Sequence, residues 1–289
     1  MARNGTAQTA PHAQAQPRIL GDLVDVSEEF EQPDQVHFVA SRVVQFDPAS
    51  GAGLLEWQRY MRQPSYSFNK MDMALVRAAP NEFPGTEYDR DPALPFEITF
   101  ITPRTIRLRF FTRDLPPGAR RDTDSLMLAG PVPSDRSWRM DSGGGVIRYR
   151  SAAGELRVIK DPWHIELYDV AGKVLTRTQT LGDPASFQPY TPFSFIRRAR
   201  DMGRSSAATF ELQYDEKIFG TGESFTRLDK RGQKLVMYLR DGQGVQNYRQ
   251  YKAVPFFLSS NGYGMFVHTS APVTFDFGHG FDQHTVIYT

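Results

Sequence analysis

The sequence predicts an all-β protein, built as an antiparallel β-sandwich, from three observations. Short segments rich in β-branched and aromatic residues recur along the chain, separated by turns of Gly, Pro, Asp or Asn. Many of these segments alternate apolar and polar residues, as a strand with one buried face does. No window of about 11 to 18 residues shows a helical period. Together these features are typical of a sandwich.

The composition is that of a globular protein and excludes several functions. Of the 289 residues, 40% are hydrophobic and 23% are charged, which is enough for a sizeable core. The formal net charge of +1 gives no electrostatic reason to expect nucleic acid or an anionic membrane as a partner. The absence of cysteine excludes disulfides, a thiolate nucleophile and a cysteine-bound metal, and it fits a reducing compartment.

The N-terminus predicts a leader ahead of one folded domain. Residues 1–17 are small and polar without an apolar period, so we expect them to be disordered and residues 18–289 to form the sandwich domain. The leader lacks the apolar region of a secretory signal, and no segment reaches the roughly 18 apolar residues of a membrane span. We therefore expect a cytoplasmic protein.

The first half of the chain predicts strands interrupted by irregular segments. Five prolines between residues 61 and 95 predict an irregular loop around one strand. Residues 113–145 are rich in Asp, Arg, Pro and Gly and predict a mobile excursion. Ile106, Leu108 and Phe110 alternate along a strand and should face the core. The strands expected here are residues 36–46, 54–57, 71–76, 96–101 and 105–111.

The second half predicts a β-meander, a loop and a last sheet region. The loop, residues 183–206, contains scattered prolines and aromatic side chains, which we expect to pack against the sandwich rather than to stack on sugars. A strand from Tyr251, a tight turn at residues 260–262 and a return strand predict a hairpin. The meander strands are expected at residues 146–150, 155–159, 163–168 and 173–176.

The most specific stretch of the sequence is Phe219–Gly242. It combines glycines that permit left-handed backbone with a cluster of charges, and its apolar run ends on Arg240, Asp241 and Gly242. A strand that stops there delivers two charged side chains at its end, where functional groups commonly lie. A carboxylate accepts hydrogen bonds from two sugar hydroxyls, and a guanidinium can orient that carboxylate. Taken alone, Asp-Gly is also a common solvated turn.

This stretch resembles the N-terminal β-sandwich of the family-31 glycoside hydrolases, the α-glucosidase and α-xylosidase group. The resemblance covers about residues 95–289 and is strongest after residue 217. Several short motifs in one order are far more specific than a lone glycine motif. The matching residues are Gly220, Gly222, Glu223, Phe225, Leu228, Lys230, Arg231, Gly232 and Gln233, then Arg240 and Asp241, then Tyr251, Lys252, Pro255, Phe256 and Phe257, and finally Gly262, Tyr263, Gly264, Phe266 and Val267.

The resemblance implies a galactose-mutarotase-like sandwich that precedes a catalytic (β/α)8 barrel, which this chain does not contain. In the family, the Arg-Asp pair lies on a loop that the sandwich extends into the active site of the barrel. The resemblance therefore implies that Asp241 contacts substrate hydroxyls and that Arg240 orients it. The implied partners are an α-linked carbohydrate and a barrel, in the same parent chain or in a separate one.

The implied reaction is retaining hydrolysis of a terminal α-glucosidic or α-xylosidic bond without a cofactor. This mechanism uses two carboxyl groups about 5 to 5.5 Å apart. In the family both belong to the barrel, so no catalytic residue is expected in this chain and the chain alone should be inert. A stand-alone carbohydrate-binding sandwich without catalysis is the alternative. A mutarotase-like enzyme is a third possibility, although a persuasive pair of His and Glu is missing.

Two charged clusters have competing interpretations. The first cluster, Glu223, Lys230 and Arg231, lies on glycine-rich backbone and could form an anion site. However, the strand–loop–helix order of phosphate-binding motifs is absent from the sequence. The resemblance implies instead a structural role at the sandwich–barrel junction. Asp276, His279, Asp282 and His284 form the only His/Asp cluster of metal-like density. Their Gly-rich backbone does not provide convergent geometry, so we expect no metal there.

Overall fold

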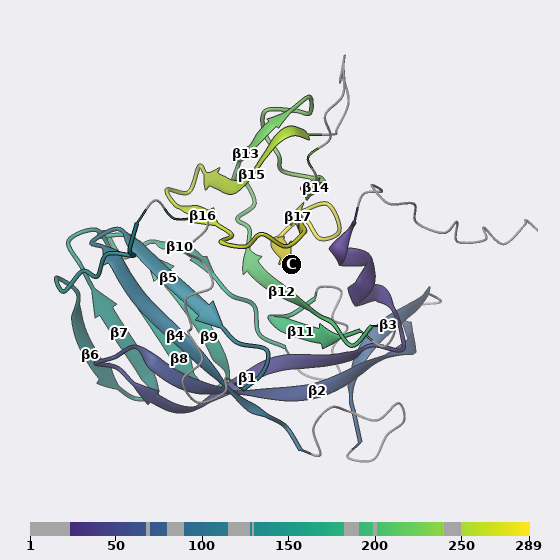
Figure 1. The fold of residues 1–289 in the computed structure, drawn as a ribbon, viewed down its shortest axis with the longest axis horizontal. Coiled ribbons are helices and arrows are strands. Elements are labelled where there is room, and N and C mark those ends of the chain that lie inside the picture. The colour runs from purple at the N-terminus through teal and green to yellow at the C-terminus, as the bar shows by residue number, and fades with distance from the viewer. Residues whose placement is uncertain are drawn as a thin grey trace, which may run out of the picture.

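The computed structural model describes residues 24–67, 70–79, 90–114, 128, 130–181, 191–198, 201–237, 239 and 250–289. The described residues contain one helix, the 3-10 helix η1 (Val26–Glu31), and otherwise antiparallel strands. These strands form sheets of ten, five and three members (Figure 1). The prediction of an all-β antiparallel sandwich is confirmed. The predicted leader, residues 1–17, lies outside the described residues.

The ten-stranded sheet joins the beginning and the end of the chain. Its strands are β1 (Val36–Asp47), β2 (Ala52–Ser67), β3 (Lys70–Arg77), β4 (Ala93–Thr102), β5 (Thr105–Phe110), β11 (Ser194–Arg197), β12 (Arg204–Glu211), β14 (Gln233–Met237), β17 (Val273–Phe277) and β18 (His284–Tyr288). Their order is β14-β17-β18-β12-β11-β1-β2-β4-β5, and β3 pairs with β2. Strand β11 therefore bridges the N-terminal hairpin and the C-terminal strands.

The five-stranded sheet is the predicted meander with one strand added. Its strands are β6 (Arg139–Gly143), β7 (Val146–Arg150), β8 (Glu155–Lys160), β9 (Trp163–Tyr168) and β10 (Val174–Arg177). They pair in sequence order from β6 to β10. The added strand, β6, lies in the segment for which we predicted an excursion, and it forms a tight hairpin with β7 around Gly144 and Gly145.

The main core lies between these two sheets. Phe38, Trp57 and Phe96 of the large sheet and Val158 and Trp163 of the meander are each no more than 2% exposed. Burying such large apolar side chains is the dominant favourable term in folding. The predicted core positions of β5 are confirmed, since the side chains of Ile106, Leu108 and Phe110 pack against this core.

The predicted loop at residues 183–206 contains part of this core. Phe195 is fully buried in β11, and its ring stacks on that of Phe38 with a centroid separation of 4.6 Å. Phe193 packs against the same core. The packing role expected for these aromatic residues is therefore confirmed at two positions, although one of them lies in a strand. Phe187 and Tyr190 lie outside the described residues.

The outer face of the large sheet is covered by η1. Asp25 caps this helix by accepting a hydrogen bond from the main-chain N–H of Ser27 at 3.0 Å. Its carboxylate also forms an ion pair with Lys234, with 2.8 Å between Oδ2 and Nζ. Phe30 of η1 is fully buried and packs with side chains from β11, β12 and β18. The sheet is therefore covered on both faces at this end.

Candidate functional site

The three-stranded sheet combines the beginning of the most specific stretch of the sequence with the predicted hairpin that follows that stretch. Its strands are β13 (Ile218–Ser224), β15 (Gln250–Ser259) and β16 (Gly264–Phe266), with β15 in the middle. The predicted hairpin is confirmed, and Gly262 adopts a φ of 98° in its turn. In Figure 1 this sheet lies at the top, above the two larger sheets. One of its faces packs on the large sheet through Phe257, which is fully buried against Phe275 and Phe277.

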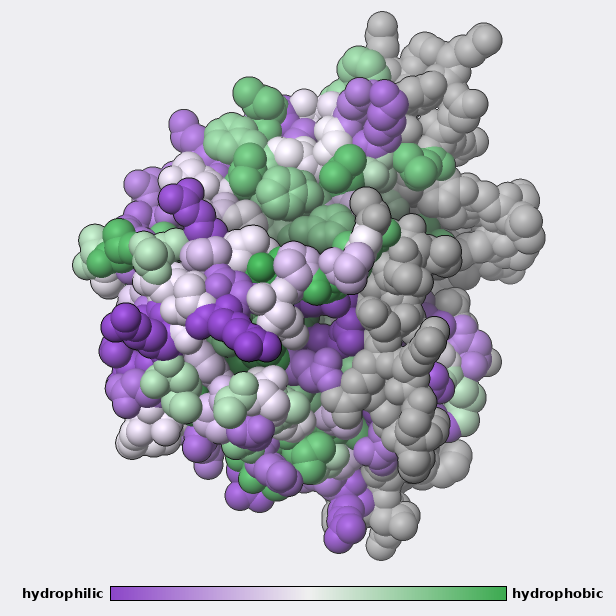
Figure 2. Space-filling model, turned by 60° about the vertical axis from the view of Figure 1, so that its left-hand side comes forward, coloured by the Kyte–Doolittle hydropathy of each residue, from purple (hydrophilic) through white to green (hydrophobic). Residues whose placement is uncertain are grey.

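The opposite face of this sheet is apolar and exposed. Along β15 the side chains of Val254, Phe256 and Leu258 are 45%, 37% and 51% exposed, in alternation with less exposed neighbours. Phe266 of β16 lies directly across from Phe256 and is 50% exposed. We call these four residues the apolar face. Figure 2 shows hydrophobic side chains gathered at the top of the molecule, over this sheet. Clustered exposed apolar side chains of this kind mark interaction sites.

The segment that follows β13 adds to the exposed apolar surface. Phe225 is 67% exposed and Leu228 is 79% exposed. Both belong to the motif residues on which the family resemblance rests. Neither side chain contributes to the described hydrophobic clusters, so the motif supplies surface here rather than core.

Three consecutive left-handed residues shape β13 next to this face. Gly220, Thr221 and Gly222 have φ values of 109°, 69° and 90°. A Cβ atom at Gly222 would lie inside contact distance of the main-chain oxygen of Lys252 on the neighbouring strand. The pairing of β13 with β15 shifts register between Gly220 and Gly222, which is a bulge. Positions 220 and 222 therefore require glycine for the close approach of two backbones.

The basic motif residues are used within the fold. The Lys230 side chain is buried, and its Nζ donates to the hydroxyls of Ser224 at 3.2 Å and Thr226 at 2.7 Å. This burial lowers the pKa of Lys230. Arg231 donates to the main-chain oxygens of residues 213, 216 and 282. These contacts support the structural interpretation over an anion site.

Arg240 and Asp241 lie outside the described residues, and their flanking strands are described. Strand β14 ends at Met237 at the edge of the large sheet, and β15 resumes at Gln250 in the middle of the three-stranded sheet. The segment with the predicted substrate-binding pair therefore joins two different sheets, and it leads directly into the strand that carries the apolar face.

The His/Asp cluster forms a turn. The carboxylate of Asp276 accepts hydrogen bonds from the main-chain N–H groups of His279 at 2.7 Å and Gly280 at 3.1 Å. Among the residues that the structure describes, no group of three His, Asp or Glu side chains could hold a metal ion. In the same part of the chain, no helix has the length and hydropathy needed to cross a membrane.

Comparison with known proteins identifies the class of domain to which this sandwich belongs. Residues 95–276 match the model of the glycosyl hydrolase 31 N-terminal galactose mutarotase-like domain. This match covers more than half of the chain, and the chain therefore belongs to that family. The family resemblance that we inferred from the motifs is confirmed.

Relatives in sequence include α-xylosidases and a transferase. An α-xylosidase of Lactiplantibacillus pentosus is 36% identical over 107 residues, which are 37% of this chain and 13% of the relative. An isomaltosyltransferase of Sporosarcina globispora is 42% identical over 55 residues, which are 19% of this chain and 5% of the relative. The chain thus spans only a small part of the length of these relatives.

Solved structures share the fold. The cycloalternan-forming enzyme of Listeria monocytogenes, in complex with a pentasaccharide substrate, matches with a TM-score of 0.58 and 16% identity over 88% of this chain and 19% of its own. A family-31 dextranase of Flavobacterium johnsoniae, complexed with glucose, matches with a TM-score of 0.55 and 17% identity over 87% of this chain and 25% of its own. At these identities the similarity establishes the sandwich fold.

Proposed function

We propose that this chain is the N-terminal sandwich of a retaining α-glycoside hydrolase that cleaves terminal α-xylosidic or α-glucosidic bonds. The observation that carries the proposal is that the apolar face lies on β15, the strand into which the segment with Arg240 and Asp241 leads along the chain. The family membership and the α-xylosidase relatives support the substrate class. The relatives are several times longer than the part that this chain matches, which leaves ample length for a catalytic domain.

In this proposal the apolar face docks on the catalytic barrel. Exposed Phe256 and Phe266 would lose water contact against the barrel, which is favourable by about 25 cal/mol for each Å² of apolar area. Docking at this face would bring the segment between β14 and β15 to the barrel. Asp241 would then accept hydrogen bonds from substrate hydroxyls, with Arg240 holding its carboxylate in place.

The two carboxyl groups of the retaining mechanism would come from the barrel. One would attack the anomeric carbon, and the other would protonate the departing oxygen and then activate water. The sandwich would contribute substrate positioning, which strengthens binding of the reacting sugar without supplying a reacting group.

A substitution in the intact enzyme that carries this chain tests the assignment. Asp241→Asn keeps the shape of the side chain and removes a charge-assisted acceptor, so kcat/KM for an aryl α-xyloside or α-glucoside should fall by roughly ten- to a hundredfold, about 1.5 to 3 kcal/mol. Arg240→Ala should cause a comparable loss. Steady-state kinetics and thermal melting of the same preparations provide the measurement.

The matched control is Asp215→Asn, which changes an exposed aspartate in a turn before β13 and should leave the kinetics at the parental value. Full activity in Asp241→Ala would end the substrate-contact assignment. A large drop in melting temperature without a specific kinetic loss would instead assign Asp241 a structural role.

The alternative function, carbohydrate binding without cleavage, is favoured by a different feature. The sandwich contains a pocket of about 410 Å³ whose lining includes Phe100, Trp138 and Tyr149 together with Arg136. This pocket is formed by residues of this chain alone, so it would function without a barrel.

A further inference from the structure

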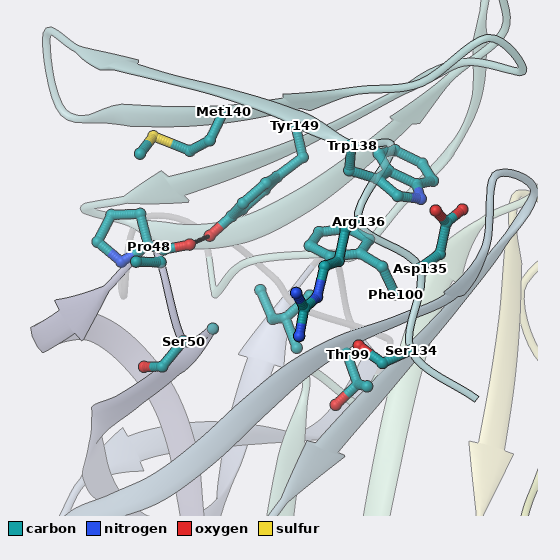
Figure 3. A pocket seen from close by; sticks show the side chains of 13 residues that line it. Pro48, Ser50, Thr99, Phe100, Ser134, Asp135, Arg136, Trp138, Met140 and Tyr149 are labelled. Carbon is teal, nitrogen blue, oxygen red and sulfur yellow. Dashed lines mark hydrogen bonds between the residues drawn. The ribbon is translucent and has the colours of Figure 1, made fainter. Parts of the chain in front are cut away.

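The pocket lies at a different end of the molecule from the apolar face. It is lined by the turn between β1 and β2, by β4, by the segment that leads into β6, and by β7 (Figure 3). None of its lining residues belongs to the three-stranded sheet. Its volume of about 410 Å³ falls in the range of roughly 300 to 1,000 Å³ that is usual for small-molecule sites.

A fixed group of aromatic rings forms one wall. The Phe100 ring stacks on Trp138 with a centroid separation of 4.7 Å, and the Tyr149 ring lies 4.8 Å from Phe100. Trp138 Nε1 donates to the main-chain oxygen of Thr102 at 3.0 Å. The Tyr149 hydroxyl donates to the main-chain oxygen of Pro48 at 2.7 Å, the dashed line in Figure 3. Because these polar atoms are already bonded, the wall offers the pocket mainly carbon surface.

The opposite side of the pocket is polar. Arg136 is exposed, and Figure 3 shows its guanidinium pointing into the pocket. No ion pair joins Arg136 to a carboxylate within the described part of the chain, so its donors are available to a ligand. The hydroxyl-bearing residues Ser50, Thr99 and Ser134 also line the pocket, and the Ser50 hydroxyl, which donates to Asp47, can still accept a hydrogen bond.

The turn that supports this polar side is held by hydrogen bonds and a close backbone contact. Asp47 accepts hydrogen bonds from the main-chain N–H of Ala49 at 3.1 Å and from the Ser50 hydroxyl at 2.6 Å. Gly51 has a φ of 73°, and a Cβ atom there would lie inside contact distance of the main-chain oxygen of Ile98. The position of Ser50 is therefore set before any ligand binds, which reduces the entropy cost of binding.

The charge of the pocket favours a neutral ligand. The carboxylate of Asp135 lines the pocket together with Arg136, and it accepts the main-chain N–H and the hydroxyl of Ser137 at 2.8 and 3.0 Å. Asp135 and Arg136 are the charged residues of the lining, so its formal net charge is zero and does not favour an anion. A wholly apolar ligand would leave the guanidinium and the hydroxyls without hydrogen-bond partners. A sugar ring satisfies both sides, because it has a C–H face and an edge of hydroxyl groups.

We propose that this pocket is a carbohydrate subsite that binds a neutral sugar residue, with its C–H face against the aromatic wall and its hydroxyls on Arg136. The subsite is separate from the position that Asp241 would contact, and it needs residues of this chain alone. It therefore goes beyond the proposed hydrolase function and stands whether or not a barrel docks on the apolar face.

Calorimetric titration of the 289-residue chain tests the subsite. The parental chain should bind isomaltotriose or maltotriose with a Kd in the millimolar range, about −4 kcal/mol. Arg136→Ala should weaken binding at least about tenfold, because it removes charge-assisted donors to the sugar hydroxyls. Arg139→Ala changes a nearby exposed arginine outside the pocket and should bind as the parent does. Equal melting temperatures would show that both variants remain folded.

Three outcomes would overturn the proposal. The first is the absence of binding by the parental chain up to about 20 mM sugar, well above the expected Kd. The second is parental affinity in Arg136→Ala. The third is that the parental chain binds sulfate but neither oligosaccharide, and that Arg136→Ala abolishes the binding of sulfate. This result would make the pocket an anion site. None of these outcomes bears on hydrolysis by the intact enzyme, so the two proposals fail independently.

Discussion

His37 is a polar side chain enclosed in the described core. It lies in β1, fully buried, and neither ring nitrogen has a hydrogen-bond partner among the described residues. Its ring stands edge-on to Phe30 at a centroid separation of 5.9 Å. Burial, together with the positive charge of Arg62, lowers the pKa of His37 to about 3. This imidazole is therefore neutral in the folded protein at any pH near neutrality.

The stability of the chain should consequently decrease in acid. Below the ordinary pKa of 6.5 the unfolded chain binds a proton at His37 that the folded chain does not bind until about pH 3. Between pH 7 and pH 5 this group alone should cost about 2 kcal/mol of unfolding free energy. Urea unfolding at the two pH values measures the loss. His37→Leu should reduce the decrease by that amount, and an unchanged pH dependence in this variant would contradict the explanation.

Arg240 and Asp241 show how far the function of a single residue can be predicted from sequence. Only their place in an ordered set of motifs distinguished them from a solvated Asp-Gly turn. The structure describes the strands on both sides and not the pair itself, so their role stays a prediction. The burial of His37 could not be read from the sequence, because it depends on the packing of η1 against the large sheet, which brings Phe30 onto the His37 ring and leaves no periodic signal in the sequence.

At the scale of elements, the strand predicted at residues 71–76 is confirmed as part of β3, but the irregular loop predicted from residue 61 is wrong up to Ser67. Strand β2 continues through Pro64 to Ser67, and β3 pairs with it. This part of β2 pairs with β3 alone, since the pairing with β1 stops at Met61. A proline without an N–H group is tolerated where one side of the strand has no partner. The alternation of apolar and polar residues predicted the strands of the meander correctly. Each of these strands pairs with its neighbour in sequence, so its formation does not depend on a distant part of the chain.

The bulge in β13 gives a prediction at this scale. Gly222→Ala places a Cβ atom against the main-chain oxygen of Lys252 at a φ of 90°, so the two strands must separate. We expect a loss of more than about 1 kcal/mol in unfolding free energy, measured by urea unfolding. The control is Gly143→Ala, since a Cβ atom there meets nothing within 4 Å. Equal stability of the two variants would show that β13 does not approach β15 as described.

At the scale of the whole molecule, the sequence predicted the sandwich but not its connectivity. Strand β11 has four residues and lies in a segment rich in proline and aromatic side chains, yet it joins β1 to β12. Pairing between segments so far apart in sequence leaves no local periodic signal. The position of the apolar face could also be seen only in the structure. Strand β15 carries apolar side chains on both of its faces, and the sequence does not show which face packs on the large sheet and which is exposed.

The most direct test of whether this sandwich serves a glycoside hydrolase is an assay of aryl α-xyloside hydrolysis. The assay compares the chain alone with the chain mixed with a separately produced catalytic barrel. The chain alone should release no aglycone, because the catalytic carboxyl groups belong to the barrel. Addition of the barrel from the intact enzyme should restore turnover. Phe256→Lys combined with Leu258→Lys should prevent this restoration by charging the apolar face, whereas Val44→Lys, at an exposed position of β1, should not. Turnover by the chain alone, or full restoration by the doubly substituted chain, would contradict the proposed docking and function.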